Sequence, residues 1–154
     1  MAEFQRGHSI ELKVPSDLNY ERIVRATARS VAQHMGFAQD RIDALGTAVG
    51  EACSNAIKHG NRSAKELSVQ IRFDMQTTGL LVEITDFGKG FTPPPSPDIA
   101  AQLTASQERG GWGIYLMQKL VDQVSFHINE QGEHLTRLYL FRKDSQCAKQ
   151  GDGH

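Results

Sequence analysis

The chain lacks most of the features that mark exported or membrane proteins. Its two cysteines, Cys53 and Cys147, are too few for a disulfide framework. No apolar run reaches the roughly 18–20 residues that a membrane-spanning helix needs. The opening stretch MAEFQRGHSIELKV has no apolar signal-peptide core. We therefore expect a cytoplasmic protein that has no membrane partner.

An excess of charge of either sign is also missing. Lys and Arg number 17 against 18 Asp and Glu, which gives a formal net charge of −1. This balance does not predict a nucleic acid partner. Hydrophobic residues make up 39% of the 154 residues, which suits one folded domain. We expect that domain to span residues 1–143, and we expect residues 144–154 to be a disordered polar tail.

Several common nucleotide- and metal-binding signatures are absent. The chain contains no G-x-x-x-x-G-K-[ST] segment, so it has no P-loop. Asp86-Phe87-Gly88 matches the metal-binding triplet of eukaryotic-type protein kinases, but no glycine-rich loop, lysine strand or HRD loop precedes it. Cys53 and His59 lie six residues apart on one predicted helix and face different sides of it. They cannot share a zinc ion.

Hydrophobic periodicity predicts five strands and three helices. Alternating residues predict strands at 8–14, 67–73, 80–85, 124–129 and 134–141, of which the middle two and the last two form antiparallel hairpins. Helical spacing predicts helices from Ser16 or Asp17 to about Met35, from Asp40 to about Gly60 and from about Gly113 to Gln123. The fold class is therefore α+β: a two-layer sandwich whose mixed or antiparallel sheet is covered on one face by helices.

The first two predicted helices carry apolar stripes that we expect to face the sheet. In the first helix the stripe consists of Leu18, Ile23, Val24, Ala28 and Val31. In the second it consists of Ile42, Leu45, Val49, Ala52, Ala56 and Ile57. Cys53 falls beside the second stripe and is predicted to be a small core residue.

Polar side chains flank the stripe of the second helix. Glu51, Asn55 and His59 follow at i, i+4 and i+8, so they lie along one side and drift by about 40° per step. A carboxylate there can act as a base, and an amide oxygen can bind a hard cation such as Mg²⁺. Taken alone, the three residues are equally consistent with a solvated helix edge.

A second motif follows the strand predicted at residues 80–85. Asp86, Gly88 and Gly90 form a D-x-G-x-G stretch directly after a predicted strand. Glycines let another group approach the backbone, and a fixed carboxylate accepts a hydrogen bond from an exocyclic amine such as that of adenine. A plain turn at the end of a strand explains this stretch as well if it is taken alone.

A third motif precedes the last helix. Arg109, Gly110, Gly111 and Gly113 lie in the stretch RGGWG, and the N–H groups at the start of a helix can bind phosphate. The proline-rich loop before it has about twenty residues, a length typical of functional or mobile segments.

Together, these motifs and their order resemble the Bergerat ATP-binding fold of histidine kinases, gyrase-type ATPases, Hsp90-type chaperones and anti-sigma factor serine kinases. The resemblance covers roughly residues 8–143. The segment EACSNAIKHG is most similar to the corresponding segment of the stand-alone anti-sigma factor serine-protein kinases of bacterial partner-switching systems. The resemblance implies that ATP and Mg²⁺ are the cofactors and that a serine of a STAS-type anti-anti-sigma protein accepts the phosphoryl group. A sigma factor as sequestered partner and a homodimer are further expectations.

The resemblance also implies a role for each matching residue. Glu51 would act as the base toward the serine, Asn55 would hold Mg²⁺ against the phosphates, and Asp86 would bind the adenine amine. Arg109 would stabilise charge on the γ-phosphate. The other nucleotide-binding candidates are His59, Gly88, Gly90, Gly110, Gly111, Gly113 and Thr136. Thr136 stands in for a Gly-Thr pair that often opens the last strand of this family, and here the glycine is absent.

The alternative function is a nucleotide-gated binding module that sequesters a partner and transfers no phosphate. It would use the same Asn55 and Asp86, whereas Glu51 favours catalysis because ATP binding alone needs no base. A sensor histidine kinase is not favoured, since His34 is followed by Met35 rather than by an acidic residue. A gyrase- or chaperone-type ATPase would need further domains.

Overall fold

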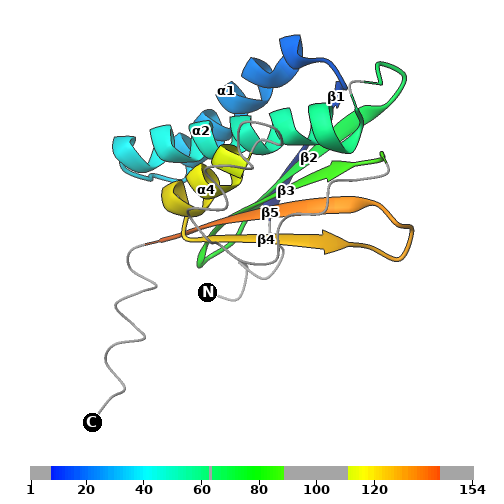
Figure 1. Cartoon of the computed structure of the whole chain (residues 1–154). Coiled ribbons are helices and arrows are strands. Elements are labelled where there is room, and N and C mark those ends of the chain that lie inside the picture. The colour runs from blue at the N-terminus through cyan, green and yellow to red at the C-terminus, as the bar shows by residue number, and fades with distance from the viewer. Residues whose placement is uncertain (1–7, 63, 89–110, 143–154) are drawn as a thin grey trace.

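The fold consists of a five-stranded sheet with a layer of helices on one face (Figure 1). The computed structural model describes residues 8–62, 64–88 and 111–142. The strands are β1 (His8–Pro15), β2 (Ser68–Met75), β3 (Gly79–Asp86), β4 (Gln123–Ile128) and β5 (His134–Phe141). The helices are the 3₁₀ turn η2 (Leu18–Tyr20), α1 (Glu21–His34), α2 (Gln39–Asn55), the π-helical turn η3 (Ala56–Gly60) and α4 (Gly111–Leu120).

The sheet has the strand order β1-β2-β3-β5-β4, and each neighbouring pair runs antiparallel. Both predicted hairpins, β2–β3 and β4–β5, are present, and β5 lies between β3 and β4. The predicted α+β sandwich is therefore confirmed, with an antiparallel sheet in the described residues. An antiparallel sheet can leave one face in water, which fits helices on the other face alone.

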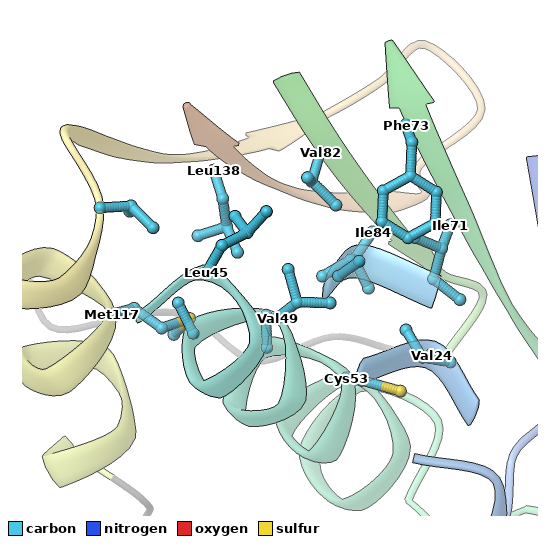
Figure 2. Packing of buried hydrophobic residues seen from close by; sticks show 14 of the residues in the cluster. Val24, Leu45, Val49, Cys53, Ile71, Phe73, Val82, Ile84, Met117 and Leu138 are labelled. Atoms are coloured by element: carbon cyan, nitrogen blue, oxygen red, sulfur yellow. The ribbon is translucent and has the colours of Figure 1, made fainter. Parts of the chain in front are cut away.

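The core lies between the sheet and the helices (Figure 2). Phe73, Val82 and Leu138 are successive partners across β2, β3 and β5, and all three are fully buried. The stripe predicted for the second helix lies on α2 and on the first two residues of η3, and each of its six members is buried. Cys53 is also fully buried, as predicted, and burial raises the pKa of its thiol to about 12. A thiol held in its neutral form in this way is a structural residue rather than a reactive one.

The predicted starts of the first two helices are wrong. Asp17 accepts a hydrogen bond from the N–H of Asn19 at 2.9 Å and so caps the short turn η2, while α1 begins only at Glu21. Leu18 therefore lies outside α1 and is 44% exposed, and Ile23, which lies on α1 but off its buried face, is 48% exposed. The second helix begins at Gln39, because the carbonyl of Ala38 accepts the first helical hydrogen bonds, so Asp40 is not the cap.

The N-terminal end of α2 is bonded to the residue before β4 and to the last residue of β5. The guanidinium of Arg41 lies 2.8 Å from both the carboxylate of Asp122 and the carbonyl of Phe141. The same carboxylate accepts the N–H of Phe141 at 2.7 Å. These contacts fix the N-terminal end of α2 where β4 begins and β5 ends, and the C-terminal half of α2 reaches the opposite end of the sheet, where β3 ends and β5 begins. Among the described helices, none has the length and apolarity required to cross a bilayer.

Candidate functional site

A cavity of about 220 Å³ opens between the C-terminal half of α2 and one end of β3, β5 and β4. Alternation along the strands explains its polar lining, because Asp86, Thr136 and His134 all point to the helical side of the sheet. The cavity is lined by Ala52, Asn55, Ala56, Asp86, Met117, Phe126, His127, Ile128, His134, Leu135 and Thr136. Three predicted site residues, Asn55, Asp86 and Thr136, therefore lie around one space.

The helix that carries Asn55 changes its winding directly after this residue. Residues 56–60 form a π-helical turn, in which the N–H of Asn61 donates to the carbonyl of Ala56 at 2.7 Å. Such turns occur often at functional sites. The wider winding means that His59 does not continue the side of α2 that bears Glu51 and Asn55. His59 is half-buried on this turn and does not line the cavity.

The π-helical turn brings Gly60 against the side chain of Asp86. A Cβ atom on Gly60 would overlap the Asp86 carboxylate and lie 2.6 Å from its Oδ1 atom. A Cβ atom on Gly88 would in turn overlap the carbonyl oxygen of Gly60. The two glycines thus let the end of the helix pack closely against the Asp86 side chain and the turn after β3. The sequence reasoning identified Gly88 but treated Gly60 only as a helix end.

Asn61 holds these two segments together. It is 2% exposed, and its Nδ2 donates to the carbonyl of Ser68 at 2.9 Å. Its Oδ1 accepts the N–H of Phe87 at 2.9 Å. The buried amide therefore satisfies both its donor and its acceptor while joining η3 to β2 and to the residue after Asp86. The sequence reasoning also missed this residue, since Gly60-Asn61 is an ordinary helix-ending pair.

Asp86 is a buried carboxylate with one unsatisfied oxygen. Its side chain is 7% exposed, and its Oδ1 atom has no hydrogen-bond partner. Burial raises the pKa of this carboxyl to about 6, against the lowering effects of His134 and of the Gly88 N–H group. Buried polar atoms are nearly always paired in folded proteins. An orphan acceptor in a cavity wall therefore fits a ligand that donates a hydrogen bond, as the amine of adenine does.

Glu51 lies one helical turn before Asn55, where the start of α4 packs against α2. A Cβ atom on Gly113 would lie 2.7 Å from Oε2 of Glu51 and 3.5 Å from Nδ2 of Asn55. Gly113 is buried, and Gly111 begins α4 two residues earlier. A helix N-terminus therefore meets the carboxylate predicted to be the base and the amide predicted to hold Mg²⁺ against the phosphates.

The remaining predicted residues are not all placed. Gly90, Arg109 and Gly110 lie outside the described residues. Within the described ranges, no group of three or more His, Cys, Asp or Glu side chains is arranged to hold a metal ion. Asn55 lines the cavity one helical turn after Glu51. Among the described residues, its amide oxygen is the candidate ligand for a cation that needs few protein ligands.

Comparison with known sequences points to one family. The profile of the histidine kinase-like ATPase domain matches residues 14–138. The serine-protein kinase RsbW of Bacillus subtilis is 38% identical over 120 residues, which cover 75% of each chain. RsbW of Bacillus velezensis is 35% identical over 125 residues, and RsbW of Oceanobacillus iheyensis is 32% identical over 130 residues, covering 78% and 79% of each chain.

Comparison with solved structures supports the same fold. The SiaB–SiaC complex of Pseudomonas aeruginosa contains a chain that superposes with a TM-score of 0.64 and 11% identity, covering 88% of this chain and 90% of that one. A Mycobacterium tuberculosis protein with RsbU and RsbW domains matches with a TM-score of 0.62 and 16% identity. That match covers 87% of this chain but 32% of the longer one. At these identities the structures show the shared fold alone.

Proposed function

We propose that the cavity beside Asn55 and Asp86 is the ATP site of this chain, which belongs to the histidine kinase-like ATPase domain family. Within that family it belongs to the anti-sigma factor serine-protein kinases of the RsbW type. The observation that carries this assignment is the unpaired, buried Oδ1 of Asp86 in the cavity wall. A donor on the bound base would remove the cost of that unpaired acceptor. Thr136 and Phe126 line the same wall and would contact the base.

In the proposed reaction Glu51 is the general base. The serine oxygen of the acceptor forms a bond to the γ-phosphorus of ATP, the bond from that phosphorus to the β–γ bridging oxygen breaks, and ADP leaves. Glu51 takes the proton of the serine hydroxyl. Phosphoryl transfer asks the protein mainly for positioning and for stabilisation of charge. The packing of Gly113 against the Glu51 carboxylate supports this role, because it fixes the base at the N-terminus of α4.

Asn55 would supply the protein oxygen for Mg²⁺. Its amide lines the cavity one helical turn beyond Glu51, and a cation that keeps most of its waters needs few protein ligands. When bound, Mg²⁺ would offset the negative charge of the phosphates. Arg109 and the glycines 90 and 110 belong to the proposed site through the family resemblance alone.

The proposed acceptor is a serine of a STAS-domain protein, and the proposed setting is the cytoplasm. The support is membership of a family whose curated relatives are named serine-protein kinases. A sigma factor as sequestered target and a homodimeric state rest on the same resemblance.

Transfer from γ-labelled ATP to a purified STAS-domain anti-anti-sigma protein tests the proposal directly. We expect one labelled serine with the wild type and a loss of about 10²-fold or more in rate with Glu51→Gln, since a positioned base contributes on that order. The exposed Glu66→Gln is the matched control and should transfer normally. ATP-dependent complex formation without any labelled serine would instead favour the non-catalytic binding module.

A further inference from the structure

His134 lies directly across the β3–β5 ladder from Asp86. Directly opposed residues of an antiparallel pair have Cβ atoms about 4.5–5.5 Å apart when they share a face. Both side chains line the same cavity, and His134 is half-buried. The motifs of the sequence draw attention to Thr136, two positions later, and give His134 no role.

The elements around Asp86 carry several titratable side chains. They are Glu51 on α2, Lys58 and His59 on η3, His127 on β4 and His134 on β5. Within the described part of the chain, His134 is the one whose charge acts on Asp86, where it lowers the carboxyl pKa that burial raises. Its position opposite Asp86 explains this effect, because Coulomb interactions strengthen at short range and with partial burial.

We propose that His134 is a positioning residue of the nucleotide site: it keeps the Asp86 carboxylate charged and thereby sets a preference for a base with an exocyclic amine. This inference rests on the proposed ATP site. A charged carboxylate only accepts hydrogen bonds, whereas a protonated carboxyl also donates one. The amine of adenine needs an acceptor. Hypoxanthine has a carbonyl at the same position, which a charged carboxylate repels and a protonated carboxyl accommodates.

The coupling of the two residues is testable without any ligand. Carbon-13 NMR of the Asp86 carboxyl in the nucleotide-free protein should show a midpoint near pH 6 in the wild type. We expect a higher midpoint in His134→Gln and a midpoint restored toward the wild-type value in His134→Lys, which returns a positive charge. An unchanged midpoint in His134→Gln would overturn the proposal.

His127→Gln is the matched control for this titration. His127 borders the same cavity, but it pairs with Leu135 on the opposite face of the sheet, and its imidazole bonds to the Ser125 hydroxyl at 2.8 Å. Its replacement should leave the Asp86 midpoint where it is in the wild type. Thermal melts of all three variants identify any that fail to fold. If His134→Gln fails to fold, the Asp86 midpoint in His134→Lys still tests whether a positive charge at position 134 lowers the carboxyl pKa.

Calorimetry with ATP and inosine triphosphate between pH 5.5 and 8 tests the base preference. We expect His134→Gln to narrow the preference for ATP several-fold near pH 6.5 and His134→Lys to retain it. Equal weakening of both nucleotides at every pH would indicate a purely structural role and overturn the inference. A wild type that binds neither nucleotide would overturn the proposed ATP site and this preference together. ATP binding with an unchanged ratio in His134→Gln overturns the preference alone.

Discussion

Gly60 lies against the carboxylate of Asp86, so closely that a Cβ atom at position 60 would overlap it. The contact joins the end of the α2–η3 helix to the end of β3. These two segments are far apart in the sequence and meet only in the folded protein. The carboxylate that we assign to the adenine of ATP can therefore occupy its position only because residue 60 has no side chain.

Gly60→Ala should therefore weaken ATP binding. The methyl group must displace the Asp86 carboxylate or separate η3 from β3, and we expect an affinity loss on the order of tenfold or more, since the loss of one charge-assisted hydrogen bond is worth about 1.5–3 kcal/mol. Gly46→Ala on α2 is the matched control, because its new methyl group meets only the flexible side chains of Arg29 and Arg25. Equal ATP affinity in both variants by calorimetry would refute the positioning role of Gly60.

Asp86→Asn should stabilise the nucleotide-free protein while it weakens ATP binding. The Asp86 carboxyl pKa rises from 3.8 to about 6 on folding, so the stability that it contributes is present below pH 3.8 and is lost as the pH rises through about 6. The difference corresponds to at most about 3 kcal/mol. We expect the gain in unfolding free energy at pH 8 and little of it at pH 4. Exposed Asp40→Asn should show no such gain in denaturant titrations.

Asn55→Ala should remove the effect of Mg²⁺ on ATP binding. The wild type should bind ATP more tightly with Mg²⁺ than without it, because an oxygen of the cavity wall completes the coordination of the cation. The variant should bind ATP equally in both conditions, as measured by calorimetry. Gln70→Ala, which removes an amide from the exposed face of the sheet, should behave as the wild type. A full Mg²⁺ effect in Asn55→Ala would mean that the cation is held elsewhere.

Gly113→Ala should slow phosphoryl transfer more than it weakens ATP binding. Its methyl group would lie 2.7 Å from Oε2 of Glu51, so the flexible carboxylate must move away. Displacing a catalytic group by about 1 Å can cost as much as a hundredfold in rate. Alanine also favours the helix over glycine by about 1 kcal/mol, so the thermal midpoint should not fall. An unchanged transfer rate to the acceptor would contradict the role of Glu51 as the base.

The sequence was sufficient to predict the elements whose signal is local. The stripe on α2 repeats over four turns, and both hairpins alternate regularly, so their place in the core could be predicted. The start of α1 could not, because Asp17 is as good a cap for a short 3₁₀ turn as for an α-helix. That choice misplaced Leu18, whereas Ile23 lies on α1 in either case and is exposed because it lies off the buried face of the helix.

The site divides in the same way. Asn55 and Asp86 belong to motifs that the sequence displays, and the structure brings them to one cavity. Gly60, Asn61 and His134 act through contacts with β3 or with the residue after it, and such contacts depend on register and on the π-helical turn. No periodic pattern in the sequence predicts these contacts. The residues that support a site are therefore harder to predict than the residues that form it.

The sheet consists of two halves that meet along one seam. The strands β1, β2 and β3 form the first half, the β4–β5 hairpin forms the second, and the β3–β5 ladder is the seam. Asp86 lies on one side of it, and His134 and Thr136 lie on the other. The two strands of this ladder are far apart in the sequence, so closing it costs loop entropy that the contacts across it must offset. Affinity for nucleotide should consequently require both halves of the sheet to be joined, which would make ligand binding a sensor of the completed seam.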